Sequence, residues 1–263
     1  MEKLINRIKT FFKYRELFFQ LVTRDIRLRY RRSVLGYFWS ILNPLLTMAV
    51  LVIVFSNIFD RRIPYFPIYV IIGHLLFHMM SGSSNSSITS IIGNANLLKK
   101  VYIPKYIFTF SSVTSELVTF FFSFCAFFVM LFINKVPFTW NIFLIFIPIV
   151  LCYIFCIGLG LFLAQATVFF RDIQHLWSVV SYAWMFLSAI FYPVTILTEN
   201  VYSFVTRFNP MYFYITIFRH FVIGSVHEDI TPLIIRGITA SAIMLLIGFV
   251  SFTRNKDKFI LHI

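Results

Sequence analysis

Residues 140–168 read WNIFLIFIPIVLCYIFCIGLGLFLAQATV and contain no charged side chain. About 20 consecutive apolar residues are enough for a helix to cross a bilayer, so this stretch predicts a membrane-spanning helix. The rest of the 263-residue chain has the same character, with 59% hydrophobic and 13% charged residues. A soluble domain has about 45–50% apolar and about 25% charged residues. The composition therefore excludes a soluble domain and a disordered chain, and it predicts an integral membrane protein.

Five further apolar runs have the length of membrane-spanning helices. We predict an all-α fold with six transmembrane helices at residues 38–59, 66–88, 106–133, 140–168, 174–197 and 232–253. The chain then forms a single transmembrane domain, 1–263. Its six-span bundle (38–253) lies between an N-terminal interfacial segment (1–37) and a short tail (254–263).

Lys and Arg are distributed unevenly about these spans. Of the 23 Lys and Arg residues, 17 lie in four segments that share one side of the membrane in this topology: 1–37, 89–105, 169–173 and 254–263. Loops rich in Lys and Arg stay in the cytoplasm, so both termini are expected there. The net charge of +13 then reflects membrane topology, and no nucleic-acid partner is expected.

Two regions depart from a regular span. The second span runs into Ser81-Gly82-Ser83-Ser84-Asn85-Ser86-Ser87, which must face other helices or a water-filled cavity because it is too polar for lipid. The connection 198–231 holds two short apolar pieces, 201–205 and 211–223, divided by Asn209-Pro210. Because neither piece can span, we predict re-entrant external half-helices between spans five and six, broken at the proline.

Residues 15–32 predict an amphipathic interfacial helix. Its apolar arc consists of Leu17, Phe18, Phe19, Leu21, Val22, Ile26 and Leu28, opposite Arg24, Arg27 and Arg31. Asp25 and Arg29 interrupt the arc with the spacing and order of a helical ion pair. A helix resting on anionic lipid accounts for the arc, whereas the intruding pair favours a charged face that also docks a cytoplasmic partner.

Polar side chains inside the spans are few. Glu116 is the only acidic residue well inside a span, and a carboxylate there should face a partner or the pore, with a structural ion pair favoured over a proton relay. His74 and His78 lie four residues apart on one face. Two ligands do not make a zinc site, so packing or pore lining is expected and no metal. Neither metal-site spacing nor a disulfide framework is indicated for the three cysteines, Cys125, Cys152 and Cys156.

Several short motifs follow one another along the chain. They are RDIRLRYRRSVLGYFWS at 24–40, Asn43-Pro44, NANLLKKVYIPK at 94–105, Phe170-Arg171-Asp172-Ile173, Phe191-Tyr192-Pro193, Asn209-Pro210 and Phe218-Arg219. In this order they resemble the membrane-spanning permease subunits of ABC-type cell-surface polysaccharide exporters, which handle O-antigen, teichoic acid, rhamnan and related polymers. The resemblance covers nearly the whole chain.

The resemblance implies a homodimeric permease in the cytoplasmic membrane of a bacterium. It implies two copies of a separate cytoplasmic ATPase as partners and a lipid-linked glycan or teichoic-acid-type polymer as substrate. The chain agrees with this division of labour, because none of its nine glycines precedes a lysine and a phosphate loop is therefore absent. ATP and Mg are expected in the partner subunit, no cofactor in this chain, and no enzymatic activity of its own.

The loop 96–105 resembles the coupling helix that inserts into the ATPase. Its expected contact residues are Asn96, Leu97, Leu98, Lys99, Lys100, Ile103, Pro104 and Lys105. Arg171 and Asp172, together with Arg24, Asp25 and Arg29, are further candidates for this coupling. Lysines that only fix the topology, and a simple turn at Arg171-Asp172, are the alternatives.

Candidate channel or gate residues gather toward the external end. They are Tyr182, Trp184, Tyr192, Pro193, Asn209, Pro210 and Arg219, with Glu116 inside the bundle. Aromatic faces can stack on sugar rings, and Arg219 could meet a phosphate of a teichoic acid or lipid carrier. An interfacial aromatic belt is the alternative for the aromatic residues.

Two other functions fit part of the sequence. A permease for a drug or small lipid would carry a large external domain, for which 198–231 is too short. An integral membrane enzyme acting on a lipid-linked sugar would need clustered acids, and only His227-Glu228-Asp229 forms such a cluster. An ion channel would need a selectivity filter or a charged ring, and none is evident.

Overall fold

A computed structural model of the chain describes residues 12–30, 35–59, 63, 65–100, 103–224 and 230–255. All regular elements in these ranges are helices, as predicted. Parts of the predictions lie outside the described residues: the segment before Phe12, residues 31–34 with Arg31 of the interfacial helix, residues 101–102 of the coupling loop, the cluster at 227–229 and the tail after Asn255.

The elements follow one another along the chain with short connections. In order they are α2 (Arg15–Tyr30), η1 (Gly36–Phe38), α3 (Trp39–Phe59), α4 (Phe66–Ser90), η2 (Ile92–Asn94), α5 (Ala95–Lys100), α6 (Tyr106–Ile133), η3 (Trp140–Ile145), α7 (Phe146–Phe169), α8 (Ile173–Leu187), η4 (Val194–Ile196), α9 (Glu199–Phe208), α10 (Pro210–Ile223) and α11 (Thr231–Asn255).

Five helical stretches are long and apolar enough to cross a membrane. They are Gly36–Val54, Phe66–Ser90, Tyr106–Ile133, Trp140–Phe169 and Thr231–Arg254, and they coincide with five of the six predicted spans. The chain is therefore a multi-pass membrane protein.

The prediction for 174–197 is wrong at its C-terminal end. Helix α8 has 15 residues and ends at Leu187, which gives it a length of about 22 Å, less than the roughly 30 Å of a hydrocarbon core. The sequence stays apolar beyond Leu187, but the helical conformation stops there, because Ala189 has a φ of 49°. A non-glycine residue in this left-handed region ends an α-helix.

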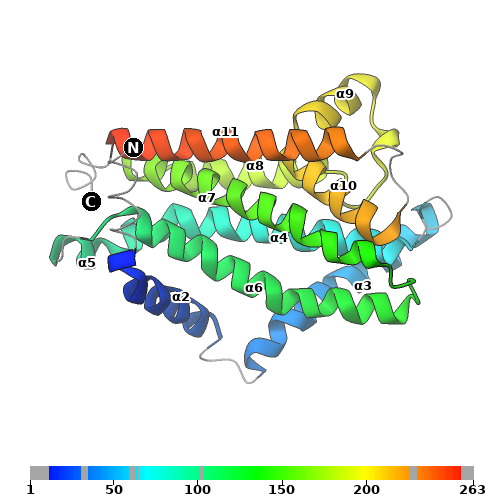
Figure 1. Cartoon of the computed structure of the whole chain (residues 1–263), viewed down its shortest axis with the longest axis horizontal. Coiled ribbons are helices and arrows are strands. Elements are labelled where there is room, and N and C mark those ends of the chain that lie inside the picture. The colour runs from blue at the N-terminus through cyan, green and yellow to red at the C-terminus, as the bar shows by residue number, and fades with distance from the viewer. Residues whose placement is uncertain are drawn as a thin grey trace.

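Helix α4 is the centre of the bundle (Figure 1). In its most apolar stretch 72% of the residues are buried, compared with 17% in α3 and 22% in α11. It contacts α3, α6, α7, α8 and α10. The helix starts at a left-handed Tyr65 with proline in its first turn, where a missing N–H and a fixed φ cost nothing. In its polar half Ser83, Ser84 and Ser87 are buried as well, whereas Asn85 is exposed.

The most extensive helix contact joins α7 and α11. It is centred on Gly158 and Gly248, where a Cβ on either residue would collide with the backbone of the other helix. Small residues allow close backbone approach, which matters in lipid because burial of apolar side chains does not drive association there.

The predicted break at Asn209-Pro210 separates α9 from α10. The Asn209 side chain accepts hydrogen bonds from the backbone N–H groups of Met211 and Tyr212, and Pro210 occupies the first turn. Helix α10 ends at Gly224, whose φ is 71°, a conformation that glycine adopts without steric cost. Eleven of the 14 residues of α10 are buried, so this helix belongs to the core.

The two ends of the bundle carry different elements (Figure 1). The start of α2, helix α5 and the end of α11 lie at one end, whereas α9 lies at the other. Among the described residues, Lys99 and Lys100 of α5 and Arg254 of α11 lie at the first of these ends, which we call the basic end.

Candidate functional site

Helix α2 packs on the bundle through part of its apolar arc. Phe18, Leu21 and Val22 are buried in one cluster with Ile103, Ile107 and Phe108. Phe19 and Leu28 remain exposed beside Arg24 and Arg27. The prediction of a single lipid-facing arc was therefore too simple, because three of its members form the contact with α6 and the loop before it.

Helix α5 forms the tip of the predicted coupling loop. Asn96, Leu97, Lys99 and Lys100 are exposed, whereas Leu98 is half-buried. Ile103 is buried beneath α2, which corrects its prediction as an anchor for a partner. It lies instead where it fixes the loop to α2, with Pro104 and Lys105 half-buried behind it.

A polar contact also ties α2 to the residues before α5. The Arg24 guanidinium donates to Asp25 Oδ1 at 2.9 and 3.0 Å and to Asn94 Oδ1 at 2.9 Å. Asn94 in turn donates to the carbonyl of Ser90 at the end of α4. The predicted Asp25–Arg29 pair is wrong, since Asp25 pairs with its neighbour Arg24.

Arg29 pairs instead with Glu116 of α6, deep in the bundle. Its guanidinium donates to both carboxylate oxygens, one of them at 3.0 Å, and Ser86 of α4 donates to the same carboxylate at 2.6 Å. Glu116 is 3% exposed. A Cβ on Gly82 would lie 2.7 Å from the carboxylate, so glycine makes the close fit to α4 possible. Three segments thus meet at one buried charge.

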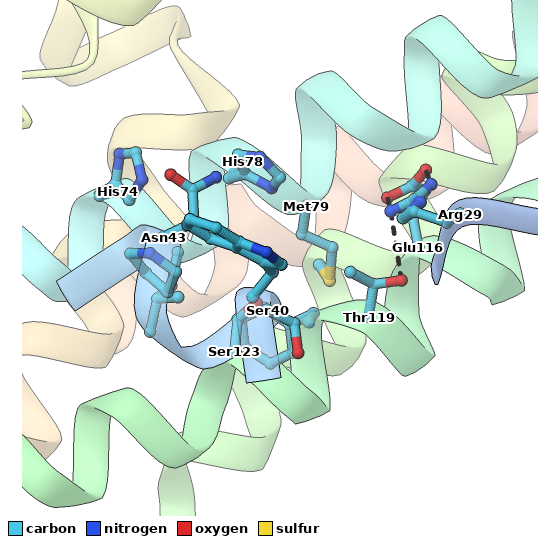
Figure 2. A pocket seen from close by; sticks show the side chains of 13 residues that line it. Arg29, Ser40, Asn43, His74, His78, Met79, Glu116, Thr119 and Ser123 are labelled. Carbon is cyan, nitrogen blue, oxygen red and sulfur yellow. Dashed lines mark hydrogen bonds and ion pairs between the residues drawn. The ribbon is translucent and has the colours of Figure 1, made fainter. Parts of the chain in front are cut away.

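This ion pair forms one end of a polar cavity of about 440 Å³ between α3, α4 and α6 (Figure 2). His74 and Asn43 lie toward the other end, with His78, Ser40 and Ser123 between. Polar groups line it from Arg29, Ser40, Asn43, His74, His78, Glu116, Thr119 and Ser123, and apolar walls come from Trp39, Pro44, Leu75, Met79 and Phe120. Within the described part of the chain, no three His, Cys, Asp or Glu residues are close enough to hold a metal.

No site role was predicted for four polar lining residues, Ser40, Asn43, Thr119 and Ser123, although the first two lie in the motifs that carry the resemblance. Their signal was present, because they repeat at helical spacing: 40 and 43 on α3, and 116, 119 and 123 on α6. Each is unremarkable alone in an apolar run. Only their convergence on His74 and His78 makes a site.

Arg219 is the largest fully buried side chain at the α9 end. It is 1% exposed and donates to the carbonyl oxygens of Tyr69, Ala189 and Ile190 at 3.0–3.2 Å. Its guanidinium lies 3.2 Å from the centre of the Tyr69 ring, within cation–π range. These contacts argue against the expected phosphate partner and give Arg219 a structural role.

Arg219 and Tyr69 together fix the segment that follows α8. The Tyr69 hydroxyl donates to the carbonyls of Ala189 and Tyr192, and the Tyr192 hydroxyl donates to the carbonyl of Phe186. A Cβ on Gly73 would lie 3.0 Å from Arg219 Nη2 and from Ile190 Cγ2, so only glycine leaves room for these contacts. We call the contacts of Arg219 with Tyr69, Ala189 and Ile190 the Arg219 clamp.

Asn209 joins the same end of α8 to α10. It accepts from Trp184 Nε1 at 2.8 Å and donates to the carbonyl of Leu187 at 3.0 Å. The side chains of Trp184, Tyr192, Asn209 and Arg219 thus all make contacts within the segment 184–192. Their role as channel or gate residues, with Pro210, stays a prediction.

A family model described as "ABC-2 type transporter" matches residues 16–223. The chain belongs to this family. It is a transport subunit, and the ATPase of such systems is a separate protein. The matched region includes the loop 96–105, the cavity and the contacts of Arg219.

Relatives of this ABC-2 permease are named for polysaccharide export. The chain is 30% identical over 259 residues to the O-antigen export system permease protein RfbA of Myxococcus xanthus, covering 97% of this chain and 98% of the relative. It is 27% identical over 250 residues to RfbA of Klebsiella pneumoniae, with 93% of each chain covered. It is 26% identical over 194 residues to the capsule polysaccharide export inner-membrane protein CtrC of Neisseria meningitidis, covering 70% and 71%.

Two predicted groups of the permease stand apart from these networks. Arg171 and Asp172 are exposed in the tight turn between α7 and α8. Tyr182 is exposed on α8 and contacts the ring of Phe186, while Pro193 is half-buried in the following segment.

Proposed function

We propose that the chain is the membrane permease of an ATP-driven exporter that moves a lipid-linked cell-surface polysaccharide, such as O-antigen or capsule, outward across the cytoplasmic membrane. The observation that carries this proposal is the similarity over nearly the full length of both chains to an O-antigen export permease. Teichoic-acid-type polymers belong to the same chemical class of lipid-linked substrate.

A polar stripe on α4 supports a hydrophilic path through the bundle. We define it as His74, His78, Ser81, Asn85 and Thr89, which repeat at helical spacing and are exposed or half-buried, whereas most of α4 is buried. A polar face along a spanning helix needs water or a polar substrate against it. The stripe accordingly lines the export path.

A homodimer completes this path. Helix α8 carries exposed apolar side chains beside the stripe, including Leu176, Val179 and Tyr182, and α4 contacts α8 next to it, with Ser181 donating to Ser81. One bundle leaves the stripe open to its surroundings. A second copy facing it encloses a path without exposing polar groups to lipid.

The basic end lies on the cytoplasmic side of the membrane. Its concentration of Lys and Arg residues satisfies the positive-inside rule, so both termini are cytoplasmic. Helix α8 serves as a short fifth span, and α9 and α10 form a re-entrant pair in the outer leaflet. The membrane is the cytoplasmic membrane of a bacterium.

Coupling to two ATPase subunits occurs at the exposed tip of α5. Leu97 supplies an apolar anchor, with Asn96, Lys99 and Lys100 around it, and Arg171 and Asp172 add a second contact. Motion of α5 reaches α2 through Ile103 and Asn94, and reaches the spans through Arg29 and Glu116. ATP and Mg bind in the partner subunit, and no cofactor binds here.

The α9 end holds the external gate. Trp184, Tyr192, Pro193, Asn209 and Pro210 form its rigid frame, which Arg219 clamps, and Tyr182 faces the partner copy. The aromatic side chains let sugar rings slide past without tight binding.

Affinity purification from the native membrane in mild detergent, followed by an ATP hydrolysis assay, tests this function. We expect a stoichiometric ATPase partner that is lost from Leu97→Asp and retained by the conservative control Leu97→Met. An intact permease that copurifies with no ATPase would overturn the exporter proposal and favour an enzyme of lipid-linked sugars. Export of a drug or small lipid, with no polymer at the cell surface, would overturn the substrate class.

A further inference from the structure

We infer that the polar cavity between α3, α4 and α6 is a binding subsite for neutral sugar units of the exported chain. The inference rests on the proposed export function and assigns a substrate chemistry to the residues that line this cavity. Its volume of about 440 Å³ falls in the range of roughly 300–1,000 Å³ typical of small-molecule sites.

The cavity lies beside the export path. His74 and His78 belong both to the polar stripe of α4 and to the cavity wall. His78 is exposed although its neighbours Phe77 and Met79 are buried, so the recess is open at its ring. A chain that passes along the stripe therefore has direct access to the cavity.

The lining favours a neutral ligand over a phosphate. The formal charges among the lining residues are those of Arg29 and Glu116, which pair with each other. Histidine is mostly uncharged at neutral pH and offers one donor and one acceptor. An anionic group would have to compete with the Glu116 carboxylate for the Arg29 guanidinium, so a polyphosphate is disfavoured.

The remaining groups match a sugar ring. Asn43 offers both donors and an acceptor, and the Ser40 and Ser123 hydroxyls offer both functions. Trp39 contributes an indole that is 43% exposed, and aromatic faces pack against the C–H faces of sugars. A wall that combines hydroxyl partners with an aromatic face recognises a polyol and leaves a hydrocarbon chain with unpaired polar groups.

Photo-crosslinking in the exporting cell tests the subsite. The photoreactive residue p-benzoylphenylalanine replaces Trp39 in the cavity, Asn85 on the stripe, or Phe121 as the control. Phe121 is an aromatic residue of α6 with 42% exposure that does not line the cavity. After irradiation of cells with the intact transporter, mass spectrometry of the permease peptides measures attached carbohydrate.

We expect carbohydrate at positions 39 and 85 and none at 121. Carbohydrate at 85 without any at 39 would overturn the subsite and leave the export function standing. Carbohydrate at neither position would overturn the export function itself, and a phosphate-only adduct at 39 would overturn the neutral-ligand assignment.

An isosteric variant gives an independent readout. Asn43→Leu removes the amide without changing the backbone, and we expect the yield of carbohydrate crosslinked at position 39 to fall about 3–10-fold, the loss of one or two neutral hydrogen bonds. The yield at position 85 should stay at the wild-type level. An unchanged yield at position 39 would show that Asn43 and the polar wall do not bind the sugar, and would contradict the subsite as described.

Discussion

At the scale of single residues, the two charged side chains that are buried in the described part of the chain each lie against a glycine of α4. Gly82 faces the Glu116 carboxylate and Gly73 faces the Arg219 guanidinium. The two glycines are nine residues apart, which places them on opposite sides of the helix. Helix α4 therefore accommodates one charge toward α6 and the other toward α10. The Glu116 carboxylate pairs with Arg29, and the Arg219 guanidinium is satisfied by backbone carbonyls and the Tyr69 ring.

Removal of the two members of the Arg29–Glu116 pair should have unequal effects. Arg29→Met leaves a 3% exposed carboxylate unpaired, whereas Glu116→Gln leaves a cation with 36% exposure that water can still reach. We expect Arg29→Met to lower the thermal unfolding temperature more, because an uncompensated buried charge costs about 3–5 kcal/mol.

The double variant Arg29→Met/Glu116→Gln should regain part of that loss, measured by thermal stability of the detergent-solubilised protein. Strictly additive effects of the two single substitutions would contradict a direct pair.

Arg219→Lys should loosen the segment after α8. Lysine keeps the charge but cannot reach the carbonyls of Tyr69, Ala189 and Ile190 with a rigid fork. We expect a loss of at least about 2 kcal/mol, since buried hydrogen bonds to a charged donor contribute about 1.5–3 kcal/mol each.

Maleimide labelling of Thr195→Cys in a Cys125→Ser background reports the loosening, because Cys152 and Cys156 are buried. Arg219→Lys should accelerate labelling, while Arg207→Lys, an exposed arginine on α9, serves as control. Equal labelling rates in the two variants would argue against the clamp.

At the scale of helices, glycine positions separate tight packing from ordinary contact. A Cβ on Gly248 would collide with the backbone at Gly158, whereas a Cβ on Gly237 of the same helix would meet side chains at 3.4–3.6 Å. Gly248→Ala should therefore destabilise the α7–α11 contact. Gly237→Ala should be neutral or stabilising, by up to about 1 kcal/mol from helix propensity. The thermal unfolding temperatures of the two purified variants test this prediction. A larger loss of stability in Gly237→Ala than in Gly248→Ala would contradict the close approach of α7 and α11 at Gly248.

Substitutions in the loop 96–105 should affect either ATPase docking or folding, depending on whether the side chain is exposed or buried. Leu97→Asp acts on an exposed side chain and should abolish ATPase association with little change in thermal stability. Ile103→Asp places a carboxylate in the cluster beneath α2 and should lower stability first, because a buried unpaired charge is costly. Stability and copurified ATPase are measured for both variants. Equal loss of stability in both would show that the loop is not divided in this way.

At the scale of the whole molecule, the polar stripe of α4 should limit transport without affecting assembly. Asn85→Trp narrows the proposed path and should reduce polymer export about tenfold or more, an effect of at least 1.4 kcal/mol on the transport barrier. Phe128→Trp on an exposed face of α6 is the matched control. Surface polysaccharide and copurified ATPase are measured together, and normal export by Asn85→Trp would contradict a path along the stripe.

Much of the architecture followed from local sequence pattern. Apolar run length predicted six spans, five of which are present. Asn209-Pro210 predicted the division of α9 from α10, because a proline and an N-cap act within one turn of chain. The fifth span was overestimated. Its end depends on the backbone at Ala189 and on the Arg219 clamp, neither of which hydropathy reports.

The sequence by itself determined that this is a helical membrane protein, where most of its helices start and end, and which motifs it shares with export permeases. These properties depend on hydrophobicity and spacing over about 20 residues. Only the tertiary structure decided the partners of the buried groups: Glu116 meets Arg29 from 87 residues away and Arg219 meets Tyr69 from 150 away. A buried charge must be compensated wherever the fold brings a partner, and helix periodicity does not specify which faces meet. The burial of Ile103 and the polar cavity have the same origin.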